Sequence, residues 1–225
     1  MKNPTDVVIA SAARTPVGAF NGSLGSLPAS ELGRTVISAA LERANVAPED
    51  VIEVIMGQIL TAGAGQNPAR QAAIGAGIPV ERTAMVINQL CGSGLRAVAL
   101  GFQSIRNGDA DVVIAGGQES MTQAPHCANL RSGQKLGSLE MIDSMLTDGL
   151  WDAFHGYHMG VTAENVATKF QVTRQEQDKF ALNSQEKALE AIKQNKFKDE
   201  ITNFKIKSKK AEIDFNKDEH PREGI

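Results

Sequence analysis

The 225-residue chain has few of the features that mark membrane, secreted or nucleic-acid-binding proteins. It contains only two cysteines, Cys91 and Cys127, which are too few for a disulfide framework. No apolar run approaches the length of a membrane span. The first residues are polar and show no signal-peptide pattern. The net charge of −3 provides no basic field that would attract nucleic acid or an anionic membrane. The sequence therefore predicts a cytoplasmic protein with reduced thiols and with neither nucleic acid nor membrane as a partner.

Four short apolar runs predict strands, with helical patterns between them. The runs cover residues 7–10, 51–56, 84–87 and 112–117. The first and the last are continuously apolar or glycine, which is typical of strands buried on both faces. Strands that alternate with helices are joined by crossovers, and such crossovers make neighbouring strands parallel. The sequence therefore predicts an α/β fold with a parallel or mixed sheet and helices on its faces.

The helices are indicated by apolar residues at helical spacing and by their end signals. The first is expected to bury one face, formed by Leu32, Val36, Ile37, Ala40 and Leu41. The second begins with Asn67 as its cap and Pro68 as its first residue. The third follows residue 91 and ends at a glycine cap, Gly108. Its expected buried stripe consists of Leu95, Val98, Ala99, Phe102 and Ile105.

The character of the chain changes after Glu119. Residues 120–158 show no sustained period and predict a long, structured loop region of the kind used for function or oligomer contacts. The later expected elements are a helix from Thr162, a second helix opened by the capping box Thr173–Glu176, and exposed strands within 201–215. We therefore predict an α/β domain over residues 1–119 and a partial loop domain over residues 120–225.

Cys91 stands where the third predicted strand turns into a helix, and Gly92 and Gly94 follow it. Such a turn projects a side chain at the carboxyl edge of the sheet, where α/β folds place their sites. The start of a helix favours a thiolate over a thiol. A thiolate there can attack a thioester carbonyl and form an acyl-enzyme. A free cysteine is also commonly a small buried apolar residue, and the local pattern alone leaves both interpretations open.

Four stretches of the chain carry a resemblance to a known family. Residues 88–98, NQLCGSGLRAV, closely resemble the acyl-enzyme signature of thiolases. Residues 13–20, ARTPVGAF, look like that family's opening motif, and residues 115–121, AGGQESM, are similar to its "AGG-x-ESM" turn. Residues 156–160, GYHMG, resemble its "HMG" loop. The sequence around Cys91 most resembles that of the biosynthetic branch, the acetyl-CoA acetyltransferases.

The resemblance implies a function and a set of site residues. Cys91 would be the catalytic nucleophile, and acetyl-CoA and acetoacetyl-CoA would be the substrates, with no separate cofactor. Leu150, His158 and Met159 would line the pocket for the acyl group and pantetheine. Without the motif, His158 would be interpreted as a solvated loop histidine. The region 122–146 resembles the loop by which these enzymes assemble, so the resemblance implies a homo-oligomer, usually a tetramer.

The resemblance also predicts that this is the N-terminal part of a thiolase. The family's activating histidine and its second cysteine belong to "GHP" and "C-x-G-G-G" motifs, and neither motif occurs here. His220 lies in a charged "DEHPR" stretch and is not expected to be the catalytic base. Without the duplicated C-terminal half, we expect a large apolar face to be exposed. The alternatives are a catalytically incompetent interaction or oligomerisation module and a ketoacyl-synthase-like condensing enzyme.

Overall fold

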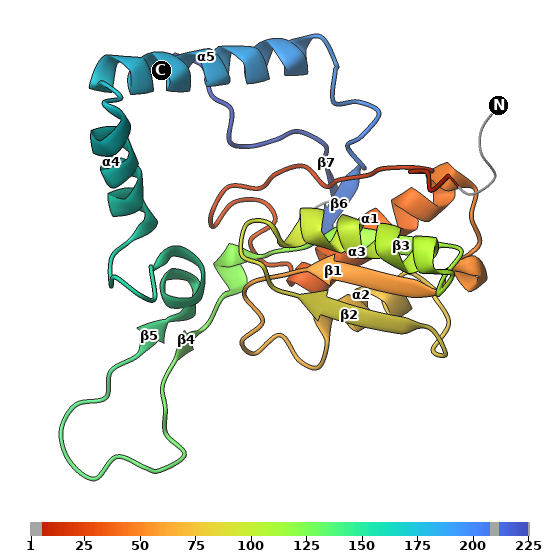
Figure 1. Ribbon diagram of the computed structural model, residues 1–225, viewed down its shortest axis with the longest axis horizontal. Helices are drawn as coiled ribbons and strands as arrows, with labels where there is room; N and C mark the ends of the chain where they lie inside the picture. Colours follow the sequence, from red (N-terminus) through yellow and green to blue (C-terminus); the bar gives the residue numbers. More distant parts are fainter. Residues whose placement is uncertain (1–5, 208–211, 225) are drawn as a thin grey trace.

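The computed structural model describes residues 6–207 and 212–224 (Figure 1). Its main helices are α1 (Ala29–Ala44), α2 (Pro68–Gly75), α3 (Ser93–Asn107), α4 (Met159–Phe170) and α5 (Arg174–Lys193). The strands are β1 (Glu53–Gly57), β2 (Thr83–Ile87), β3 (Val113–Gly117), β4 (His126–Cys127), β5 (Ile142–Asp143), β6 (Phe204–Lys207) and β7 (Glu212–Phe215). Short turns of helix occupy Pro48–Asp50 (η1), Met121–Gln123 (η2) and Met145–Leu150 (η3). No helix in the described part of the chain is both long and apolar enough to span a bilayer.

The central sheet confirms the predicted parallel arrangement. β1 lies in the middle and pairs in parallel with β2 on one side and β3 on the other. Helix α3 packs on one face, while α1 and α2 cover the other (Figure 1). The alternation of β1 shows this directly, because Val54 and Met56 join the cluster formed with α1 and α2 while Ile55 is buried on the opposite face. This arrangement keeps β1 almost free of solvent.

Helix α3 buries a different stripe from the one that the sequence predicts. The buried residues are Ser93, Ala97 and Gly101, whereas Leu95 is 79% exposed and Phe102 is 50% exposed. The small residues allow the helix to approach the sheet closely, since a methyl group on Gly101 would lie 3.1 Å from a methyl of Val113. The larger apolar side chains therefore point away from the sheet. They give α3 the exposed apolar face that the resemblance leads us to expect.

Two strand predictions also need correction. Residues 7–10 form no strand, and Val8 and Ile9 are 64% and 80% exposed. Strand β3, expected to be buried on both faces, is only partly buried because it is an edge strand of the described three-stranded sheet. A continuous apolar run predicts burial, but burial requires a neighbouring element to cover the run.

The later elements agree better with the sequence. The capping box of α5 is present, with the hydroxyl of Thr173 accepting from the N–H of Glu176 while the Glu176 carboxylate accepts from the N–H of Thr173. β6 and β7 form an antiparallel pair within the region expected to hold exposed strands. Helix α4 begins at Met159, three residues before the expected start at Thr162. His158 supplies its N-cap, a role that the periodicity of apolar residues does not reveal.

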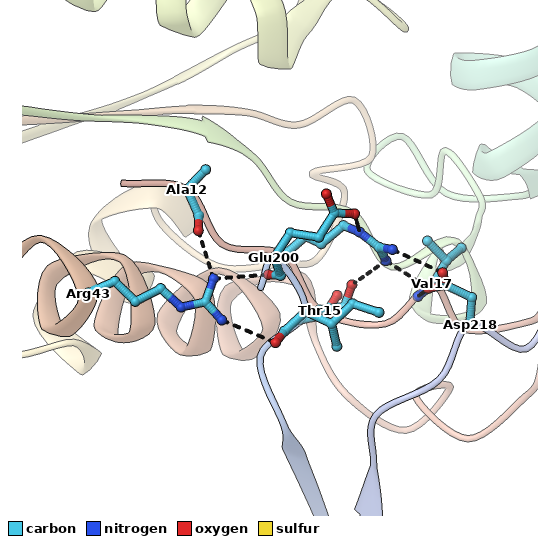
Figure 2. A network of polar contacts seen from close by, with 8 residues as sticks. Ala12, Thr15, Val17, Arg43, Glu200 and Asp218 are labelled. Atoms are coloured by element: carbon cyan, nitrogen blue, oxygen red, sulfur yellow. Dashed lines mark hydrogen bonds and ion pairs between the residues drawn. The ribbon is translucent and has the colours of Figure 1, made fainter. Parts of the chain in front are cut away.

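A polar network ties the C-terminal segment to the N-terminal segment (Figure 2). The guanidinium of Arg14 donates two hydrogen bonds to the Asp218 carboxylate, at 2.7 and 3.0 Å, and a third to Glu200 at 2.6 Å. Arg43 donates to the backbone carbonyls of Ala12 and Glu200. Burial raises the pKa of Asp218, but the hydrogen bonds from Arg14 and from the Val17 N–H outweigh it and leave the pKa below its ordinary value.

Candidate active site

The three parallel strands end at one edge of the sheet, and the candidate site residues follow them. β1, β2 and β3 end in register at Gly57, Ile87 and Gly117. The segment after β2 carries Cys91, whose side chain is exposed. The structure thus confirms the predicted strand, turn and helix around this cysteine. The carboxyl edge of a parallel sheet is where α/β folds bind ligands.

The turn that carries Cys91 is held tightly against β1. Gly92 is the N-cap of α3 and offers no capping side chain. A methyl group on Gly57 would lie 2.6 Å from both the carbonyl carbon and the Cβ of Ser93, well inside van der Waals contact. Only a glycine in β1 therefore lets the first turn of α3 approach so closely. This contact determines the position of the helix start immediately beside Cys91.

Polar side chains join the segments that follow β1 and β3. The carboxylate of Glu119 accepts hydrogen bonds from the N–H groups of Ile59 and Leu60, at 2.8 and 3.2 Å. Glu119 therefore orients the backbone at Ile59 and Leu60. Burial raises its pKa above the ordinary value, although the two N–H donors oppose the shift. By accepting these two hydrogen bonds, the Glu119 carboxylate holds the backbone of the segment after β1 in place at the edge of the site.

Gln58 and Gln118 form a buried pair that the sequence analysis missed. The amide of Gln118 donates to the side-chain oxygen of Gln58 at 2.9 Å, and Gln58 in turn donates to the carbonyl of Leu60. The side-chain oxygen of Gln118 is buried and has no hydrogen-bond partner among the residues that the structure describes. A usable signal was present, because β1 and β3 both end at a glycine that a glutamine follows. Polar residues that follow adjacent parallel strands at the same register lie close enough for their side chains to meet.

The predicted pocket residues lie together at the base of one loop. Trp151 and His158 form an isolated antiparallel bridge, and their rings meet edge-on with centroids 6.5 Å apart. The bridge brings Leu150, which precedes Trp151, close to Met159, which follows His158. The His158 Nδ1 accepts a hydrogen bond from the N–H of Gly160 at 3.0 Å. His158 is partly buried, and Met159 is 38% exposed.

The loop with these pocket residues packs on the segment that follows β1. A methyl group on Gly149 would meet the Leu60 side chain at 3.7 Å, so the end of η3 packs on the loop after β1. Within residues 6–207 and 212–224, no hydrogen bond, ion pair or ring contact joins Cys91 to Leu150, His158 or Met159. The structure thus brings the three pocket residues together around the bridge between Trp151 and His158.

The remaining histidines and the second cysteine do not build a metal site. His155 lies 3.3 Å from the carboxylate of Asp152, and His126 lies 3.9 Å from that of Asp143. Cys127 is exposed in β4. The described residues contain no group of three or more histidine, cysteine or acidic side chains that could hold a metal ion.

Comparisons with known proteins agree with this geometry. The family model described as "Thiolase, N-terminal domain" matches residues 7–225. The chain is 61% identical over 224 residues to an acetyl-CoA acetyltransferase of Rhizobium meliloti, covering 100% of this chain and 57% of that relative. It is 55% identical to a cytosolic acetyl-CoA acetyltransferase of Rattus norvegicus, covering 97% of this chain and 55% of the rat protein.

A solved structure supports the fold as well as the family. The crystal structure of the Bacillus anthracis acetyl-CoA acetyltransferase matches with a TM-score of 0.93 at 39% identity, over 97% of this chain and 55% of that chain. The chain therefore spans a little more than half the length of the relatives it matches. The family model covers nearly all of the sequence, and the parallel sheet with Cys91 at its carboxyl edge fits it: this chain belongs to the thiolase family.

Proposed function

We propose that Cys91 of this chain accepts an acetyl group from acetyl-CoA. The thiolate attacks the thioester carbonyl, the C–S bond to coenzyme A breaks, and coenzyme A leaves as its thiolate. A base then removes a proton from the α-carbon of a second acetyl-CoA, this carbon attacks the acetyl carbonyl, and the C–S bond to Cys91 breaks, which gives acetoacetyl-CoA and releases the Cys91 thiolate. Thiolysis is the reverse. The single observation that carries the proposal is an exposed cysteine at the start of α3, within the matched thiolase domain.

The loop beside this edge supplies candidate substrate contacts. Leu150, His158 and Met159 lie at its base, where His158 forms the closing bridge and the other two adjoin it, and Met159 is partly exposed. Because His158 Nδ1 accepts from Gly160, the neutral ring carries its proton on Nε2 and can donate from that side. We propose that Leu150 and Met159 contact the apolar part of the thioester and that His158 provides a polar contact.

The same proposal includes the location, the substrate class and the assembly of the protein. Three relatives with more than half of their length matched are named acetyl-CoA acetyltransferases, and the rat protein is named cytosolic. We infer a cytoplasmic acyltransferase that uses coenzyme A thioesters and works in a homo-oligomer. The family's activating histidine and second cysteine belong to motifs that the 225 residues do not contain. The acetyl-transfer half-reaction is therefore the step to test on this chain.

The test is acetylation of the purified chain by acetyl-CoA, followed by peptide mass spectrometry and by an assay of acetoacetyl-CoA thiolysis. We expect an acetyl thioester on the peptide containing Cys91, absent in Cys91→Ala and retained in Cys127→Ala. The Cys127 variant is a matched control because both cysteines are exposed. A folded wild-type chain that remains unacetylated, or that acetylates Cys127 equally well, would contradict the proposal.

A second candidate function follows from the exposed apolar face of α3. Leu95 and Phe102 are largely exposed there, and a large exposed apolar patch is typical of an interaction site. In this alternative the chain binds full-length thiolase subunits and catalyses nothing. Co-sedimentation with such subunits, combined with a lack of acetylation on Cys91, would favour it over the enzymatic proposal.

A further inference from the structure

The residue before Cys91 has an unusual backbone conformation. Leu90 has a φ of +49°, in the left-handed region. Every other non-glycine residue with a positive φ in the described part of the chain is an asparagine or a glutamine. Asparagine tolerates this conformation, whereas leucine is disfavoured there by its side chain. Such a conformation persists only where the surrounding contacts enforce it.

The contacts that enforce it converge on Ser93. The Ser93 hydroxyl donates to the carbonyl of Leu90 at 2.6 Å and accepts from the N–H of Gln89 at 2.8 Å. The Ser93 N–H donates to the same Leu90 carbonyl at 3.0 Å. A single hydroxyl thus bridges the peptide group before Gln89 and the peptide group after Leu90, using its one donor and one of its acceptor sites. The N–H of Leu90 is held by the side chain of Asn88 at 2.9 Å.

Ser93 can act as an anchor because it is buried and packed against β1. Its relative exposure is 4%, and it contacts the backbone of β1 at Gly57. Leu90, by contrast, is 54% exposed, so its side chain gains little from packing that would explain its conformation. The strained residue is therefore held by these hydrogen bonds, among them those of the Ser93 hydroxyl, and not by burial of the leucine.

We propose that Ser93 is a positioning residue for Cys91. By keeping Leu90 in the left-handed conformation, the Ser93 hydroxyl sets the direction in which the Cys91 side chain leaves the turn. Loss of the hydroxyl frees Leu90 to return to a negative φ, which rotates the peptide plane that leads into Cys91. This role rests on the proposed function of Cys91 for its catalytic meaning. The conformational part can be tested without it.

The test compares wild type with Ser93→Ala, Leu90→Asn, the double variant and Ser104→Ala. Ser104 is a control on the same helix, partly buried, with a single long hydrogen bond to Glu53. For acetyl transfer to Cys91 we expect a loss of about tenfold or more in Ser93→Ala, because small misplacements of a reacting group are costly. We expect no change in Ser104→Ala. Leu90→Asn should restore much of the loss in the double variant, since asparagine accepts the left-handed conformation without the hydroxyl.

A second readout separates this proposal from the proposed function. Iodoacetamide alkylates both exposed cysteines. The ratio of Cys91 to Cys127 labelling in the same molecule therefore reports the accessibility and reactivity of the Cys91 side chain. Ser93→Ala should change this ratio, and Leu90→Asn should return it toward the wild-type value. If wild type is not acetylated, the function proposal fails and this ratio decides the role of Ser93. An unchanged ratio in a folded Ser93→Ala protein would overturn the positioning role.

A further pair of variants covers the case in which Ser93→Ala does not fold. Ser93→Thr keeps the hydroxyl, and Ser93→Val places a side chain of the same shape as threonine there, but without a hydroxyl. Circular dichroism establishes that each is folded before its cysteines are compared. Wild-type-like labelling in the threonine variant with an altered ratio in the valine variant supports the proposal. Equal ratios in the two variants would refute it.

Discussion

Replacing Gly57 by alanine should destabilise the protein through one contact. The new Cβ would lie 2.6 Å from two Ser93 atoms and 2.7 Å from the Gly94 nitrogen. Carbon atoms in contact normally stand about 3.5–4.0 Å apart, so the deficit is about 1 Å. Two of the three opposing atoms belong to backbone and cannot rotate away. Overpacking typically costs about 1–3 kcal/mol, and we expect the upper part of that range.

The matched control is Gly94→Ala in the helix that makes this contact. A Cβ on Gly94 would meet Gly116 at 3.8 Å, an ordinary van der Waals contact. Alanine is also favoured over glycine within a helix by about 0.5–1 kcal/mol, so we expect no loss of stability. The pair therefore differs in steric fit while sharing the same chemical change.

Urea unfolding followed by circular dichroism at neutral pH measures both variants. With a typical urea dependence, a loss of about 3 kcal/mol lowers the midpoint by about 1 M or more. Gly57→Ala should show this shift and Gly94→Ala should not. Equal midpoints for Gly57→Ala and wild type would refute the close contact between β1 and α3. A similar loss in both variants would show that glycine flexibility, and not steric fit, governs this region.

Three further predictions concern polar contacts. Asn67 caps α2 from a left-handed conformation and donates to the carbonyl of Ala84, so Asn67→Ala should cost about 2 kcal/mol of unfolding free energy and Asn67→Gly distinctly less, by urea unfolding. The pKa of Asp218 is lowered by Arg14, so its stabilisation is present above the unfolded-state pKa of about 4 and is lost as the pH falls through the folded-state pKa. Asp218→Asn should therefore be less stable than wild type at neutral pH, with the difference shrinking in acid, and a constant difference would contradict this. The pKa of Glu119 is raised by burial, so wild type should gain stability relative to Glu119→Gln as the pH falls from neutral toward about 4, the opposite trend.

Local patterns predicted the elements of the fold well, because they depend on neighbours in sequence. The proline start of α2, the glycine cap of α3 and the capping box of α5 were all expected and are all present. The position of Cys91 between a strand and a helix followed from the same reasoning. The family could be recognised from motifs around residues 13–20, 88–98 and 115–121, and the comparisons confirm it.

Predictions of burial were less successful, since burial depends on what lies opposite. Val8 and Ile9 are apolar yet exposed, and the larger apolar residues of α3 face solvent while Ser93, Ala97 and Gly101 pack on the sheet. Periodicity finds the more apolar stripe of a helix, whereas close packing against a sheet selects small residues. The buried pair of Gln58 and Gln118 was missed because its partners are 60 residues apart.

The sequence by itself determined the family, the α/β class with a parallel sheet and the chemical identity of the nucleophile candidate, because each is encoded in short contiguous patterns. Only the tertiary structure decided how that cysteine is held. The left-handed Leu90, the hydroxyl of Ser93 and the space left by Gly57 act together across a turn and a neighbouring strand. The contact between Leu90 and Ser93 is local, but the turn is positioned by its packing against Gly57 on a strand that is remote in sequence, and only the folded chain sets that distance.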